Sequence, residues 1–228
     1  MEKTDLNIIK AACISLLKTP LIEEEKDNLF LSHPVFENRL IWLTDAHEFR
    51  MFDLYESPDD LNAAVGIYTD EINKKLFLQD LFLIIRRPYR MFLFKLVKDY
   101  LSAEDYARML AFVWTDAEDP DQDPNVSISE IIGFFKKADK RHLMSFAEYL
   151  RYNDLPDSFV VYRGVGKGVA RLGLSWTQDP EKANEKAKSF GDDGYVLKGM
   201  AKKTDVLACF TDHEGYKIVI DPKTLREP

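Results

Sequence analysis

Apolar residues recur at helical spacing through roughly the first two thirds of the chain. In "TDLNIIKAACISLLKT" the residues Leu6, Ile9, Cys13 and Leu16 follow one another at intervals of one turn, which is typical of an amphipathic helix. Serine begins two of the later stretches and an aspartate follows three residues on, which predicts a helix start. The further helical stretches are 57–87, 102–114 and 127–152, and Pro88 marks a boundary in or after the first of them.

The pattern changes after "NDLPDS". The runs "FVVYRG", "GLSWT", "YVLKGM", "DVLACF" and "YKIVID" are short, rich in β-forming residues and separated by Gly, Asp and Pro. One helix, "DPEKANEKAKSF", interrupts them, with Asp179 as its cap and Pro180 at its first position. The prediction is therefore an α+β chain: a helical domain over 1–155 and a small mixed or antiparallel β-sheet domain over 156–228.

Composition narrows the class of protein. The 228 residues carry a net charge of −8, so the overall field does not favour duplex nucleic acid. Cys13 and Cys209 are far apart and form no zinc-binding spacing, which favours two reduced thiols. The most apolar stretch, 74–97, is broken by charges and Pro88 before it reaches the ~20 residues of a spanning helix. With no signal peptide at the N-terminus, we expect a soluble cytoplasmic protein with no membrane partner.

An acidic segment, "DPDQDPNVSISE" (119–130), has two interpretations. Its alternating oxygen ligands are spaced like those of a calcium-binding loop, with the positions Asp119, Asp121, Asp123 and Glu130. Its sixth position is Pro124, where that loop needs glycine for a sharp turn. Ser127 and Glu130 also fit a helix capping box. We favour an acidic connection between helices and expect no metal. A structural or calcium-responsive protein that acts by binding a partner stays an alternative function; it rests on this acidic segment and on the basic cluster "RRPYR" at 86–90.

The strands carry polar residues that favour ligand binding. Arg163 ends the first strand, and the glycines that follow, Gly164 first, let a ligand approach the backbone. A guanidinium at such a place suits a phosphate-bearing ligand, although a solvated charge or an ion pair is the alternative. In "GLSWT", strand alternation predicts Ser175 and Thr177 on one face and Trp176 on the other, which is also the pattern of an ordinary strand.

Taken in order, these segments resemble a known family. The series "VYRG", "GLSWTQDPEKA", a short helix, "GYVLKGMAKKTDVLACF" and "YKIVIDP" is similar to the ADP-ribosyltransferase fold over about residues 156–225. The likeness is to its arginine–serine–glutamate branch, and within it to compact bacterial and phage domains. The resemblance implies NAD as substrate and transfer of ADP-ribose to a protein or another macromolecule, in the cytoplasm of a bacterial or an infected host cell.

The resemblance also assigns roles to residues. It implies that Arg163 contacts the phosphate or the nicotinamide ribose, and that Ser175 and Thr177 shape the nicotinamide pocket. An aromatic residue, Phe190 or Trp176, would stack near the nicotinamide. The implied NAD-binding set is Arg163, Gly164, Ser175, Trp176, Thr177 and Phe190.

The family's catalytic glutamate stands at the head of the last strand and stabilises the oxocarbenium-like charge as nicotinamide leaves. Here that position holds Lys217, and Gly215 stands two residues earlier. Glu214 is the nearest carboxylate, and it would reach the site only through a bulge. Two hypotheses result: an active mono-ADP-ribosyltransferase whose catalytic residues are Glu214, Arg163 and Ser175, or a degenerate member that acts by binding a partner.

Overall fold

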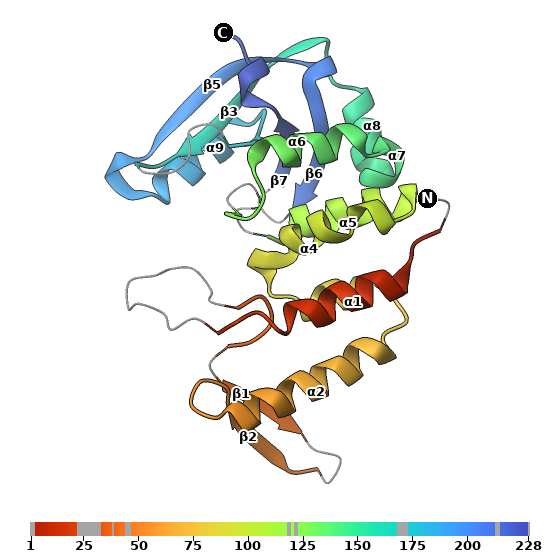
Figure 1. The fold of residues 1–228 in the computed structure, drawn as a ribbon. Coiled ribbons are helices and arrows are strands. Elements are labelled where there is room, and N and C mark those ends of the chain that lie inside the picture. The colour runs from red at the N-terminus through yellow and green to blue at the C-terminus, as the bar shows by residue number, and fades with distance from the viewer. Residues whose placement is uncertain are drawn as a thin grey trace. The chain divides into compact units, whose positions relative to one another are not determined.

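The structure is a computed structural model that describes residues 3–21, 33–37, 39–43, 47–117, 120, 123–167, 173–212 and 215–227 (Figure 1). It combines helices with small antiparallel sheets, which confirms the α+β class. The chain divides into two compact units, Met1–Ser102 and Ala103–Pro228. Among the helices that the structure describes, none has both the length and the apolar character that crossing a membrane requires.

Helices and a β-hairpin make up the described part of the first unit. The elements are α1 (Leu6–Leu16), β1 (Arg39–Leu43), β2 (Phe49–Asp53), α2 (Pro58–Lys74), α3 (Leu78–Ile84), η1 (Arg87–Tyr89), α4 (Arg90–Val97) and η2 (Lys98–Tyr100). The Ser57 side chain accepts the Asp60 N–H, so the predicted start of α2 is confirmed. The predicted helix over 57–87 is broken at Lys75, which is extended, and Pro88 lies in η1.

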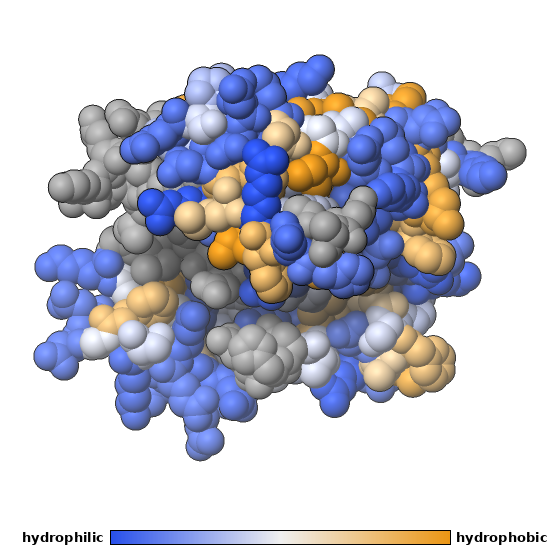
Figure 2. Space-filling view, turned by 90° about the horizontal axis from the view of Figure 1, so that it is seen from below, coloured by the Kyte–Doolittle hydropathy of each residue, from blue (hydrophilic) through white to orange (hydrophobic). Residues whose placement is uncertain are grey.

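The hairpin contradicts the expectation of helices throughout this region. β1 and β2 are antiparallel, with Leu40 opposite Phe52 and Trp42 opposite Arg50. This face turns toward α2, where Trp42 lies 6.1 Å from the Tyr68 ring. The other face of the hairpin exposes apolar side chains. Because β1 therefore carries apolar residues on both faces, its sequence does not show the apolar–polar alternation from which a strand is predicted. The exposed set is Ile41, Leu43, Phe49 and Met51, and Figure 2 shows apolar residues at the surface among polar ones.

A buried histidine anchors the segment before the hairpin. His33 is 0% exposed, and its Nδ1 accepts the backbone N–H groups of Val35 (3.0 Å) and Phe36 (2.9 Å). Its ring stacks on Phe36 with centroids 4.9 Å apart. Arg86 donates from Nη1 to the Phe36 carbonyl at 3.1 Å. Burial, and secondarily the Arg86 charge, lowers the pKa of His33 to about 4, so the ring is neutral at neutral pH.

Helices and five strands form the second unit. Its elements are α5 (Ala103–Asp116), α6 (Ile128–Lys137), α7 (Lys140–Leu143), α8 (Phe146–Asn153), β3 (Ser158–Val165), β4 (Ser175–Trp176), α9 (Pro180–Lys188), η3 (Gly191–Asp193), β5 (Tyr195–Lys202), η4 (Lys203–Asp205), β6 (Val206–Asp212), β7 (Gly215–Ile220) and η5 (Pro222–Thr224). The single helical stretch expected over 127–152 is three helices, because Asp139 and Ser145 each cap a new one. The predicted caps Ser127, with Glu130, and Asp179 are confirmed.

The strands form two small sheets joined at one point. β3 pairs with β5, and β7 lies between β4 and β6, all antiparallel. Only a bridge between Tyr162 and Thr177 joins β3 to β4 in the described chain, through N–H···O bonds of 2.7 and 2.9 Å. The strand order is therefore β5-β3-β4-β7-β6, with a seam at β3/β4. Helix α9 packs on β3 and β5, whereas α6 and α8 pack on β6.

The change from helices to strands falls between α8 and β3, near the predicted domain boundary. The compact second unit nevertheless includes helices α5 to α8 as well as the strands. The predicted domain boundary at 155/156 stays a prediction.

Candidate functional site

Arg163 of β3 reaches across the seam to the backbone of β4. Its Nη1 donates to the Ser175 carbonyl oxygen at 2.8 Å, and the side chain is half-buried. The guanidinium lies against the Cα of Gly173, where a Cβ would stand only 2.0 Å from Nη2. The structure thus brings the arginine segment and the Ser-Trp-Thr segment into direct contact. Gly173 makes this approach possible because it has no Cβ. The sequence did not predict this role from the position of Gly173 before "LSWT".

The residues of β4 alternate as predicted. Ser175 lies opposite Val219 and Trp176 opposite Ile218. Trp176 is 5% exposed, and its indole N–H donates to the Gly173 carbonyl at 2.9 Å, so the ring belongs to the core.

The ladder register assigns the polar side chains to faces, because directly opposed residues of an antiparallel pair share one face. Val219 is two residues from Lys217, so Lys217, Ser175 and Thr177 lie on the same face of the sheet. Thr177 also pairs with Tyr162, so the neighbouring Arg163 projects from the opposite face, the face of Trp176. Arg163 therefore meets Ser175 through the backbone rather than through the hydroxyl.

Gly164 is a packing position. A Cβ there would lie 2.3 Å from the Ala183 carbonyl oxygen and 2.6 Å from the Ala187 nitrogen, so the glycine lets α9 sit directly on β3. Gly166 has the same relation to Phe190, whose Cγ would be 2.6 Å from the added atom. Phe190 is 37% exposed, much more than the other aromatic candidate, Trp176.

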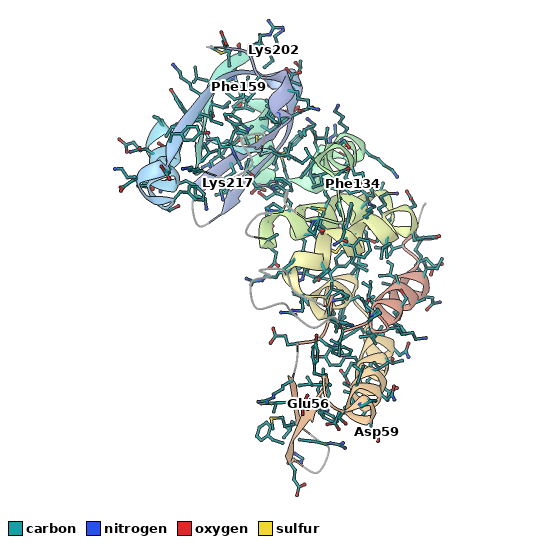
Figure 3. All side chains as sticks on the ribbon, turned by 60° about the vertical axis from the view of Figure 1, so that its left-hand side comes forward. Glu56, Asp59, Phe134, Phe159, Lys202 and Lys217 are labelled. Carbon is teal, nitrogen blue, oxygen red and sulfur yellow. The ribbon has the colours of Figure 1, made fainter. Side chains whose placement is uncertain are left out.

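The head of β7 is the place where the resemblance to the ADP-ribosyltransferase fold would put a glutamate. Lys217 lies opposite Phe210 of β6 and is half-buried (Figure 3). Glu214, the carboxylate nearest to that position in the sequence, lies outside the described residues. Gly215, directly after it, has φ +120°, a conformation that residues with a side chain rarely adopt. The first residue of β7 therefore departs from regular strand geometry, so the rule that successive side chains point to alternate faces does not hold at this end of the strand.

The acidic segment uses its described carboxylates locally. Asp123 accepts the backbone N–H of Asn125 at 2.8 Å, and Glu130 accepts the Ser127 N–H at 2.9 Å in the capping box. Asp119 and Asp121, the other two ligand positions of the calcium interpretation, lie outside the described residues. In the part of the chain that is described, no group of three or more potential metal ligands occurs.

Neither thiol has the character of a nucleophile. Cys13 and Cys209 are both buried, and burial raises the pKa of Cys13 to about 12 and that of Cys209 to about 11. The Cys209 N–H points at the Met144 sulfur at 3.3 Å. Because a thiolate is the reactive form, chemistry by these side chains is disfavoured near neutral pH.

Comparison of the chain with protein-family models, with curated proteins and with solved structures found no match.

Proposed function

We propose that residues 156–228 form an NAD-dependent mono-ADP-ribosyltransferase module that passes ADP-ribose to a protein or another macromolecular acceptor. The observation that carries the proposal is the meeting of three motif strands that are distant in sequence. β4 pairs with β7 and is bridged to β3, and Arg163 bonds to the Ser175 backbone. A transferase of this type requires that its arginine, serine and glutamate strands converge on one site.

The chemistry of the residues on these strands fits the substrate, with Arg163 on the sheet face opposite to Ser175 and Thr177. A guanidinium held by a glycine and a carbonyl is pre-oriented, and its fork suits a phosphate of NAD. The face that carries Ser175 and Thr177 offers hydroxyl groups for a carboxamide or a ribose. Phe190 is the better partner for nicotinamide stacking, since Trp176 is packed in the core.

In this proposal Glu214 supplies the carboxylate. The positive φ of Gly215 supports it, because this end of β7 departs from the regular strand conformation on which the alternation of side chains depends. The carboxylate would stabilise positive charge on the ribose as nicotinamide departs. In the family a second glutamate, two residues before the catalytic one, usually guides an arginine acceptor. Gly215 stands at that position here, so an arginine is not the obvious acceptor.

A second function is favoured by Lys217: a catalytically degenerate module that acts by binding a partner. The residue shares a face with Ser175 and Thr177, where the family's carboxylate would stand. An ammonium group there repels a developing cation and so opposes transfer.

A labelled-NAD assay separates these functions, with nicotinamide release and label on protein as its two readouts. The set comprises the parent chain, Glu214→Ala and Lys217→Glu, with Glu181→Ala as a control for removal of an exposed carboxylate from α9. Turnover that is lost in Glu214→Ala and kept in Glu181→Ala supports the active enzyme. Turnover that arises only in Lys217→Glu supports the degenerate module. No turnover in any of them, with no heat of NAD binding by calorimetry, contradicts the transferase and any role that depends on NAD.

A further inference from the structure

The second unit contains an open cavity that the proposed NAD site does not use. Its volume is about 520 Å³, within the roughly 300–1,000 Å³ range of small-molecule sites. The walls come from helix α5, from the turn that leads α7 into α8, and from the end of β6. Neither Arg163 nor Ser175 lines it, so a ligand bound in this cavity would be independent of the NAD proposal.

The floor of the cavity is apolar and fixed. Leu143, Met144 and Phe210 line it and are 2%, 4% and 4% exposed. Phe210 packs on the Phe135 ring of α6, 6.3 Å between centroids, so its position is set by the core. Phe112 adds a half-buried aromatic ring from α5. Such a floor suits a flat apolar ring.

The rim, in contrast, is cationic. Arg108, Arg141 and His142 line the cavity, all three exposed. The carboxylate in the lining, Glu148, is engaged by backbone donors: its Oε1 accepts the Thr211 N–H at 2.6 Å and its Oε2 the Ser145 N–H at 2.8 Å. The lining thus holds two arginines against one glutamate, a small local excess of positive charge in a chain of net charge −8.

One pairing limits the rim. Arg108 Nη2 lies 2.7 Å from Glu104 Oε1, and both side chains are about half exposed. An exposed pair one helical turn apart is weak, because water and salt screen it. An anion that enters the cavity would compete with Glu104 for the Arg108 guanidinium. Removing the charge of Glu104 would therefore strengthen anion binding.

We propose that this cavity binds a small organic phosphate: a flat ring on the floor of Phe112, Met144 and Phe210, and a phosphate group between Arg108 and Arg141. Two guanidinium forks match the oxygens of a phosphate, and the hydroxyls of Thr115 and Thr211 lie in the lining as further hydrogen-bonding groups. The ring and the anion are both needed, since neither the floor nor the rim alone encloses a ligand.

The test uses the full chain and phenyl phosphate as the minimal probe, titrated by calorimetry beside inorganic phosphate and benzyl alcohol. Phenyl phosphate is expected to bind more tightly than either fragment. Arg141→Ala and Arg108→Ala should each weaken it by about tenfold, and Glu104→Gln should strengthen it by about two- to fivefold by releasing Arg108. Arg226→Ala, an exposed arginine outside the cavity, is the matched control and should change nothing.

Far-UV circular dichroism checks that each variant folds. Folding is expected for the variants at positions 104, 108, 141 and 226 because these side chains are exposed, and Arg163→Lys keeps the positive charge at a half-buried position. The proposal is overturned if the parent binds no phenyl phosphate at millimolar concentration, or if both arginine variants bind it like the parent. It is also overturned if Arg163→Lys removes binding while Arg108→Ala and Arg141→Ala do not, since the probe would then occupy the proposed NAD site.

Discussion

Acidification should weaken the first unit through one side chain, His33. Its ring is fully buried, and its Nδ1 already accepts two backbone N–H groups, so a proton there would remove both bonds. Its pKa falls from 6.5 to about 4, chiefly through burial. Between about pH 6.5 and pH 4, His33 is therefore protonated in the unfolded chain and neutral in the folded chain.

Both the sign and the size of the effect come from this pKa shift. The stabilisation is complete above about pH 6.5, declines as the pH falls toward about 4, and is then fully lost. A shift of about 2.5 units at about 1.36 kcal/mol per unit gives roughly 3 kcal/mol in all. Between about pH 7.5 and pH 5 the loss is about 2 kcal/mol, a large part of a small unit's stability.

The matched variant is His33→Asn, whose side-chain oxygen can accept the same N–H groups without titrating. Pulse deuterium labelling across a urea series, with α1 and α4 peptides as readouts, gives the unfolding free energy of this unit alone. The parent should lose about 2 kcal/mol more than the variant between the two pH values. Every residue other than position 33 is the same in both chains, so its contribution cancels in the comparison. Equal pH dependence in parent and variant would refute the reasoning, because the histidine would then titrate alike in both states.

Three further predictions concern the second unit. Gly133→Ala, at an exposed position of α6, has open space around the new methyl and should raise stability by about 0.5–1 kcal/mol. Gly194→Ala would place a Cβ 1.9 Å from a carbonyl oxygen of α9 and should lower stability by about 1–3 kcal/mol; thermal melts that rank the two variants otherwise would contradict the packing. Ser127→Ala removes the cap of α6 and should cost about 1 kcal/mol, seen as faster amide exchange in its first turn. Cys13 and Cys209, with raised thiol pKa values, should resist a thiol reagent at about pH 8 in the native chain and react after unfolding in denaturant; rapid native labelling would show that they are not buried.

Helix starts were predictable because capping is local. Ser57, Ser127 and Asp179 each satisfy backbone N–H groups two or three residues away, so a short sequence window contains all the information. The capping box at Ser145 was equally visible in "SFAE" and would have divided the last helical stretch correctly. The hairpin was missed since both faces of β1 carry apolar residues, and its turn segment contains no Asn-Gly or Asp-Gly pair.

The site was predictable in composition but not in geometry. Sequence alternation correctly separated Ser175 from Trp176, because side-chain direction in a strand depends only on the neighbours. It could not reveal that Arg163 starts from the face of Trp176, because that depends on the register between β3 and β4, fixed by the Tyr162–Thr177 bridge. The rim of the cavity was equally hidden: Arg108 and Arg141 are 33 positions apart and meet only in the packed unit.

The seam between β3 and β4 gives Arg163 a structural role, so its loss would affect the sheet as well as any ligand. In the described chain, the Tyr162–Thr177 bridge and the hydrogen bond from Arg163 to Ser175 connect the two strands. Arg163 therefore stabilises the sheet, whether or not it also binds a ligand. A chain of this fold would therefore need Arg163 for its sheet even if it carried out no transfer. In the proposal above, the residues that distinguish the active transferase from the degenerate module are Glu214 and Lys217, not Arg163.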